Sequence, residues 1–222
     1  MVAVARVRGQ LECERAWSCV PDAVIVATGS TDLPYPFSGA TYPGVLARRA
    51  VQILVNQHRV LPGRKVAIIG AGSDADELEI DILLAGGEVV WKDVAPAPMR
   101  VGEPPPATHV AIAVGRQADV SVATMAGAAL SFAPELGGWV PLADRQMRCP
   151  ETDVFVAGDA AGVGSVGAAI SEGRLAGIAA AAFVGLANER DIEATRERGG
   201  QELAWRLEMR AQLEPTYAQP YA

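Results

Sequence analysis

The stretch KVAIIGAGSDADELEIDILLAGGEVVWKD, residues 65–93, decides the fold of this chain. Its first residues, Lys65–Ile69, form an unbroken apolar run, which is typical of a strand buried on both faces. A glycine-rich turn follows, and we expect a helix over about 74–85. After Gly86-Gly87, residues 88–93 read as a second strand. Strand, helix and strand in this order predict a parallel βαβ unit.

The turn of this unit has the pattern of a dinucleotide fingerprint. Gly70 and Gly72 allow a tight turn and a close approach of backbone to pyrophosphate, and the small Ala75 lets the helix pack on the sheet. The helix N-terminus supplies amide donors. Asp93 ends the next strand, where a carboxylate can accept hydrogen bonds from ribose hydroxyls. The pattern indicates a nucleotide site.

The charges at the start of the same helix argue the other way. Asp74, Asp76 and Glu77 stabilise the helix dipole but repel a pyrophosphate. A βαβ unit that is purely structural is therefore an equal alternative, and the residues alone leave both interpretations open.

Two further buried strands end in glycine. DAVIVAT, residues 22–28, leads to Gly29, and VFVA, residues 154–157, leads to Gly158-Asp159. Ligands of open α/β sheets bind beyond the carboxyl ends of the strands. A carboxylate at Asp159 can accept from sugar or ribityl hydroxyls, or it can simply cap the following helix. The presence of two such strand ends favours a ligand, and we expect Gly29 and Asp159 to lie close together.

These motifs carry a resemblance. Thr28-Gly29 and TDVFVAGDAAG, residues 152–162, resemble the late FAD motifs of flavoproteins with two dinucleotide-binding domains, the pyridine nucleotide–disulfide reductase superfamily. The run LPYPFSGATYPGVLARRAVQILVNQHRVLPGRKVAIIGAGS, residues 33–73, is similar to alpha subunits of hydrogen cyanide synthase, opine oxidase, dye-linked proline and hydroxyproline dehydrogenases, and sarcosine oxidase. The similarity extends from about residue 23 to residue 185.

The resemblance implies an α/β, Rossmann-like FAD/NAD(P)-binding fold, with a parallel sheet and helices. Residues 1–38 and 108–187 would form a partial FAD-binding domain. Residues 39–107 would form a reduced NAD(P)-binding-like βαβ insert, and residues 188–222 a helical tail.

The resemblance also implies the binding residues. Thr28 and Gly29 would lie near an FAD, and Gly158 and Asp159 would hold its ribityl–pyrophosphate region. A second nucleotide, NAD(P) or ATP-like, is expected at the inserted unit. Its site would consist of Gly70, Gly72, Ala75 and Asp93.

Three departures from the family shape the expected partners. No strand–GxGxxG–helix precedes Ala23, the segment between Asp93 and the strand at Val110 is short and proline-rich, and no cysteine-rich segment follows the C-terminal helix. We expect a truncated form whose partners are a separate FAD-containing catalytic subunit and a chain that supplies the missing N-terminal FAD half.

The resemblance then implies an electron-transfer subunit of an amine or amino-acid dehydrogenase (oxidase) complex. One alternative is a non-catalytic scaffold subunit that has lost its cofactor. Another is a stand-alone NAD(P)H-dependent reductase. No side chain is an obvious general base, so catalytic residues stay unassigned.

Composition sets the remaining bounds. Of the 222 residues, 50% are hydrophobic, enough for a core, and the net charge of -7 argues against nucleic acid and anionic membrane as partners. Three cysteines and two histidines favour neither a disulfide framework nor a metal site. The first residues do not resemble a signal peptide, and the apolar stretch over 177–187 is too short for a bilayer. We expect a cytoplasmic protein without a membrane span.

Two smaller expectations concern the last third of the chain. Cys149, beside Pro150, is interpreted as a small packed residue rather than a redox group. The alternation of Arg and Glu over residues 189–210 predicts a helix with a solvated face and i,i+4 ion pairs.

Overall fold

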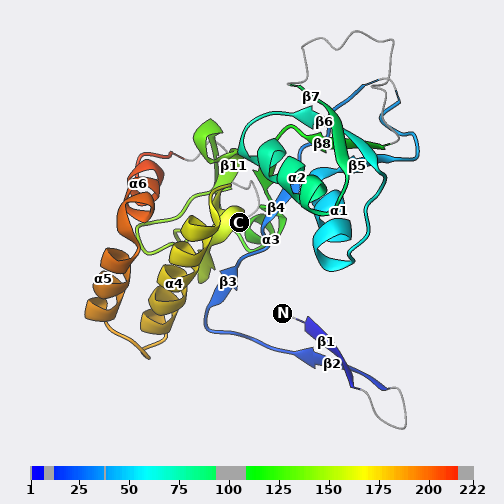
Figure 1. Cartoon of the computed structure of the whole chain (residues 1–222). Coiled ribbons are helices and arrows are strands. Elements are labelled where there is room, and N and C mark those ends of the chain that lie inside the picture. The colour runs from blue at the N-terminus through cyan, green and yellow to red at the C-terminus, as the bar shows by residue number, and fades with distance from the viewer. Residues whose placement is uncertain (1, 8–12, 38, 94–108, 215–222) are drawn as a thin grey trace. The chain divides into compact units, whose positions relative to one another are not determined.

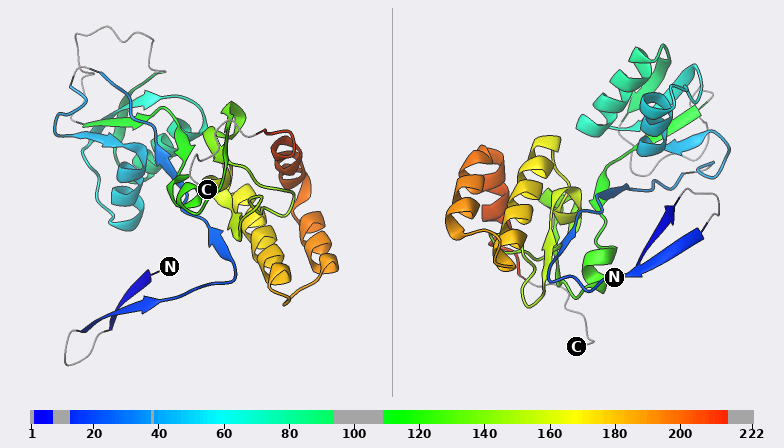
Figure 2. Two further views of the ribbon diagram at one scale, coloured as in Figure 1. Left: turned by 180° about the vertical axis from the view of Figure 1, so that it is seen from behind. Right: turned by 90° about the horizontal axis from the view of Figure 1, so that it is seen from below.

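The computed structural model describes residues 2–7, 13–37, 39–93 and 109–214. They form two compact units, which are shown in Figures 1 and 2. Unit 1 comprises Met1–Gly29 and Ala118–Ala222, and unit 2 comprises Ser30–Gln117. Both contain parallel strands together with helices, so the predicted α/β class is confirmed. The proline-rich segment over 95–107 lies outside the described residues.

Unit 1 contains a short parallel pair of strands. Strand β3 (Val24–Val26) pairs with β12 (Val154–Val156), with Val26 opposite Val156. The other edge of β12 is covered by residues 147–149, because the Cys149 N–H donates to the Val154 carbonyl at 2.8 Å. Among the described residues, β3 has only β12 as a partner strand.

Three helices complete this part of unit 1. They are α4 (Val166–Phe183), α5 (Glu189–Arg198) and α6 (Gly200–Arg210), and Figures 1 and 2 show α5 and α6 beside α4. The Ser165 hydroxyl caps α4 by accepting the Ala168 N–H at 3.0 Å. A capping box formed by Asn188 and Asp191 begins α5.

The core of unit 1 lies between α4 and the strand pair. Phe155 of β12 is fully buried, and the helix side of the core consists largely of small residues such as Ala176 and Ala179. Small side chains let a helix approach a sheet closely, as the alanine- and glycine-rich sequence predicts. By length and composition α4 is apolar enough to cross a membrane. One face of α4 packs within unit 1, where its Glu172 is fully buried against α6.

The remaining elements of unit 1 are short. Strands β1 (Val2–Val7) and β2 (Cys13–Ser18) pair antiparallel. Strands β10 (Leu130–Ala133) and β11 (Gly138–Pro141) form an antiparallel hairpin. Helix α3 (Ser121–Met125) completes the set.

Unit 2 is a four-stranded parallel sheet in the order β5-β8-β6-β7. These strands are β5 (Val45–Ala47), β8 (His109–Ala113), β6 (Lys65–Gly70) and β7 (Glu88–Asp93). Helix α1 (Arg48–Gln52), which continues as a π-helical turn over Ile53–Gln57, and helix α2 (Ser73–Leu84) lie side by side on the sheet (Figure 1). Strand β4 (Ser30–Asp32) pairs with β9 (Arg116–Ala118).

The βαβ unit predicted over residues 65–93 is confirmed in order and nearly in extent. Its neighbours differ from the expectation. The run GVLARRAVQILVNQHR, residues 44–59, has a helical period and predicts a helix from Gly44. The helix begins only at Arg48, because Val45–Ala47 first pair with β8. Pairing with a neighbouring strand overrides the helical period of a three-residue segment.

The unit boundaries also differ from the predicted domain boundaries. Strand β8 was expected in the FAD-type domain, which was to resume at residue 108, but it lies between β5 and β6 in unit 2. The tail predicted from residue 188 belongs to unit 1, where α5 and α6 pack against α4.

Candidate functional site

The two glycine-ended strands are neighbours in unit 1. Val26 and Val156 are register partners, and the Ala157 N–H donates to the Val26 carbonyl at 3.1 Å. Gly29 and Asp159 each follow this paired position by three residues. The parallel pairing therefore carries both segments to the same end of the strand pair, as expected for a ligand site beyond strand carboxyl ends.

On the β3 side, the backbone at Gly29 is open. Gly29 has φ +82°, and a Cβ added there would meet no atom within 4 Å. Its carbonyl accepts the Asp119 N–H at 2.9 Å, and the Thr28 hydroxyl donates to the Asp119 carbonyl at 2.9 Å. These bonds tie Thr28-Gly29 to the segment before α3 and fix the turn.

On the β12 side, Gly158 begins a 3-10 helix over Gly158–Ala161. Gly158 has φ +63°, and an added Cβ would lie 3.4 Å from the Ala169 Cβ of α4. The Asp159 Oδ1 accepts the Gly164 N–H at 3.2 Å. Helix α4 is capped by Ser165, so the carboxylate of Asp159 shapes the loop before the helix rather than capping the helix itself.

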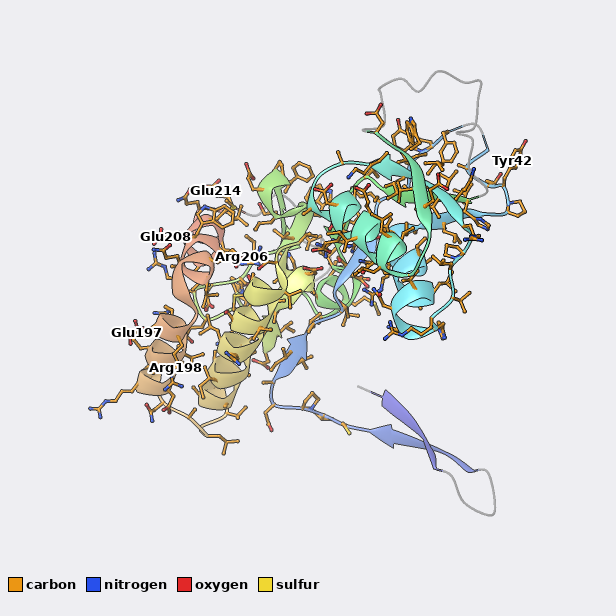
Figure 3. The ribbon with its side chains drawn as sticks, viewed as in Figure 1. Tyr42, Glu197, Arg198, Arg206, Glu208 and Glu214 are labelled. Atoms are coloured by element: carbon orange, nitrogen blue, oxygen red, sulfur yellow. The ribbon has the colours of Figure 1, made fainter. Side chains whose placement is uncertain are left out.

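The loop after Asp159 is held from α6 by a buried arginine that the sequence did not reveal. Arg206, labelled in Figure 3, donates from Nη2 to the Gly162 carbonyl at 2.6 Å and from Nη1 to the Val163 carbonyl at 3.2 Å. Its Nε donates to Glu172 Oε1 at 2.7 Å, and Arg210 Nη2 donates to the same oxygen at 3.2 Å. Arg206 and Arg210 are 2% and 3% exposed, so the predicted solvated face is wrong at these positions.

The buried triad holds one carboxylate and two guanidinium groups. Burial lowers the pKa of Arg210, the neighbouring Glu172 raises it, and Arg206 lowers it. Burial and the charge of Asp144 raise the pKa of the nearby Cys149 thiol to about 12, although Arg210 lowers it. Cys149 is therefore an unreactive packed thiol, in agreement with the sequence interpretation.

In unit 2, the fingerprint residues follow β6 as predicted. Gly70 has φ +151°, and an added Cβ would lie 2.0 Å from the Ala113 carbonyl oxygen of β8. Gly72, at φ +77°, precedes α2 and faces open space. Ala75 is fully buried in the core of the unit, and Asp93 is the exposed register partner of Ile69 at the end of β7.

The acidic start of α2 is paired with arginines. Arg116 Nε donates to Asp74 Oδ2 at 3.1 Å, and Arg48 Nη1 lies 3.5 Å from Asp74 Oδ1. Arg48 Nε lies 3.6 Å from Asp32 Oδ1. The carboxylates are evident from the sequence, but both arginines were missed, because they are 26 and 42 residues away from Asp74 along the chain.

Two further observations bound the chemistry. A hollow of about 400 Å³ in unit 2 is lined by none of the predicted site residues; its lining is Val55, Asn56, Arg59, Leu61, Asp81, Leu84 and Ala85. Within the described residues, no group of three or more His, Cys, Asp or Glu side chains could hold a metal ion.

Comparison with known proteins finds similarity to oxidase subunits. An opine oxidase subunit from Agrobacterium tumefaciens (strain Ach5) is 26% identical over 218 residues, which cover 72% of this chain and 43% of the relative. The alpha subunit of sarcosine oxidase from Rhizobium meliloti (strain 1021) is 34% identical over 80 residues, 36% of this chain and 8% of the relative. No protein-family model matches.

Solved structures agree in fold. L-proline dehydrogenase from P. horikoshii has a TM-score of 0.60 at 23% identity, covering 98% of this chain and 45% of that one. An FAD-dependent pyridine nucleotide-disulphide oxidoreductase from Desulfovibrio vulgaris has a TM-score of 0.54 at 18% identity, covering 78% of this chain and 56% of that one.

The chain spans about half the length of the opine oxidase subunits it matches. The predicted resemblance is nevertheless confirmed by both kinds of comparison. The chain is a relative of subunits of opine oxidase and sarcosine oxidase, and it has the fold of FAD-dependent oxidoreductases.

Proposed function

We propose that this chain is a flavin-linked electron-transfer subunit of an amine or amino-acid dehydrogenase (oxidase) complex in the cytoplasm. FAD, when bound, accepts electrons from one partner and passes them to another. The observation that carries the proposal is the parallel pairing of β3 with β12, which brings Gly29 and Asp159 to one end of the strand pair.

The residues at this end fit part of an FAD. The open space beside Gly29 admits a ligand close to the backbone. Gly158 and Asp159 form the turn below it, and Asp159 offers a carboxylate that can accept from ribityl hydroxyls. Thr28 acts indirectly, because its hydroxyl already donates to the Asp119 carbonyl and positions the turn.

The remaining edge of β3 supports a partner. The Val24 N–H and the Val26 carbonyl both bond to the β12 side, so the backbone groups of Ile25 face the opposite edge. Within the described ranges no strand pairs there, and Ile25 is 45% exposed. In parallel sheets, the faces are normally covered by helices, and an open strand edge is normally paired with another strand or covered. A parallel strand contributed by a partner chain would complete the sheet beside a separate FAD-containing catalytic subunit.

Visible absorption tests this proposal. The chain is purified with the product of the adjacent gene, and the complex is scanned for a flavin band. Asp159→Asn is expected to lower the flavin content, while the control Asp153→Asn, an exposed carboxylate just before β12, is expected to leave it unchanged. Loss in both variants, or in neither, would remove Asp159 from the site.

The spectrum also separates the two rivals. An assembled but colourless complex would favour a scaffold subunit without cofactor. An NAD(P)H-dependent reductase, the other alternative, draws support from the βαβ geometry of unit 2 alone. Titration with NADH and NADPH tests this alternative. Because carboxylates surround the start of α2, we expect neither nucleotide to bind.

A further inference from the structure

The start of α2 in unit 2 has the backbone of a phosphate site. Gly72 precedes the helix and has no side chain that could cap its first amides. In dinucleotide-binding βαβ units the pyrophosphate rests on such amides, which carry the positive end of the helix dipole. The charges around these amides therefore decide whether a phosphate group can bind there.

The nearest carboxylate at this helix start is already paired. Asp74, the second residue of α2, has a side chain that is 15% exposed, and it receives Arg116 Nε on one oxygen and Arg48 Nη1 beside the other. Arg48 is itself 6% exposed and also faces Asp32. Arg116 is therefore hydrogen-bonded to Asp74, and Arg48 forms ion pairs with carboxylates at 3.5–3.7 Å, although its Nε has no hydrogen-bond partner among the described residues.

The net charge around the start of α2 opposes the binding of a phosphate group. Three carboxylates, of Asp32, Asp74 and Glu77, surround the two arginines, which leaves one negative charge. Lys92 does not compensate, because it bonds to Asp76 and Glu79, and those hydrogen bonds raise its pKa. A pyrophosphate would bring further negative charge to a site where Arg48 is already desolvated.

The glycines do not require a nucleotide either. A side chain at Gly70 would collide with the Ala113 carbonyl of β8, so strand packing alone demands glycine there. Ala75 is explained in the same way by its burial in the core. Packing of the fold alone therefore accounts for Gly70 and Ala75, two residues of the fingerprint.

We propose that the carboxylate of Asp74 replaces the dinucleotide phosphate, so that unit 2 binds no dinucleotide. The network of Arg48, Arg116, Asp32 and Asp74 instead joins β4, α1, α2 and β9 within the unit. The inference is independent of flavin binding in unit 1.

Isothermal titration of the full chain with NADH, NADPH and ADP tests the proposal. The unaltered protein is expected to show no binding tighter than about 1 mM. Asp74→Ser, which removes one negative charge and the carboxylate that Arg48 and Arg116 share, is expected to gain measurable ADP binding. The matched control Asp76→Ser, in the same helical turn but paired with Lys92, is expected to gain none.

Two results would overturn the proposal. One is binding of NADH, NADPH or ADP to the unaltered chain at micromolar concentration. The other is a folded Asp74→Ser protein, judged by circular dichroism, that gains no affinity. Asp74→Asn keeps the side-chain volume while removing the charge, so it takes the place of Asp74→Ser if that variant does not fold.

Discussion

Arg206 Nη2 lies 2.6 Å from the carbonyl oxygen of Gly162, so the last helix of unit 1 holds the loop that follows Asp159. The same guanidinium reaches the Val163 carbonyl and the buried carboxylate of Glu172. Only a planar group with several donors can satisfy these three acceptors at once. Helix α6 is therefore connected to the candidate flavin site, although Arg206 lies 44 residues beyond Gly162 along the chain.

Arg206→Lys should loosen this loop. A lysine ammonium cannot bridge both carbonyls and Glu172, so we expect the unfolding free energy to fall by about 2–4 kcal/mol. Urea unfolding followed by circular dichroism measures the change. Arg198→Lys, on the exposed surface of α5, serves as the control and should alter stability by less than about 0.5 kcal/mol. Equal stability of the two variants would contradict the assigned role.

Glu172→Gln should be more harmful than a typical single substitution. It leaves the guanidinium groups of Arg206 and Arg210 buried without their carboxylate, which costs about 3–5 kcal/mol. Replacing Glu172 and Arg210 together by leucine should recover part of the loss, because one uncompensated charge is then removed. Chemical denaturation of the double variant and of Glu172→Leu and Arg210→Leu alone measures the coupling, and additive losses would show that the triad is not coupled.

Cys149 should make stability fall in alkaline solution. Its folded pKa is about 12, above the usual value of 9.0, so its contribution is complete below pH 9 and is lost as pH rises toward 12. The expected slope is at most about 1.4 kcal/mol per pH unit. Unfolding at pH 8 and pH 10 should show a smaller difference for Cys149→Ala than for the unaltered chain.

Alkylation gives an independent check on the same thiol. Native protein treated with iodoacetamide should carry the label on the exposed Cys19 and not on Cys149. Peptide mass spectrometry locates the label. Rapid modification of Cys149 in folded protein would mean that the thiol is accessible and ionised.

Gly158→Ala should destabilise unit 1 by about 1–2 kcal/mol, because φ +63° is costly for a residue with a Cβ. The comparison is Gly173→Ala in the middle of α4, where an added Cβ meets no atom and should stabilise the helix by up to about 1 kcal/mol. The midpoint temperature of thermal unfolding should fall for Gly158→Ala and rise for Gly173→Ala. A shift in the same direction would remove the conformational argument for Gly158.

Local patterns predicted much of this fold. The apolar runs at Lys65–Gly70 and Val154–Val156 are strands because their sequences suit burial on both faces, and α2 and α4 follow their expected boundaries within two residues. Residues 45–47 were misassigned because pairing with β8 decides their conformation, and β8 lies more than 60 residues away.

The candidate site was predictable only in part. The placement of Gly29 and Asp159 at one end of the strand pair follows from two visible motifs and the rule for parallel sheets. The arginine partners of Asp74 and Glu172 could not be predicted from the sequence. An arginine in a charged segment is normally expected to be exposed to solvent unless its long-range contacts are known.

The contact between Gly70 and the Ala113 carbonyl has an evolutionary consequence. Selection for a properly packed sheet would preserve that glycine whether or not any nucleotide were ever bound. A glycine-rich motif of this kind can thus remain in a sequence after nucleotide binding has been lost. Its presence then reflects the close packing of two adjoining strands rather than the binding of a nucleotide.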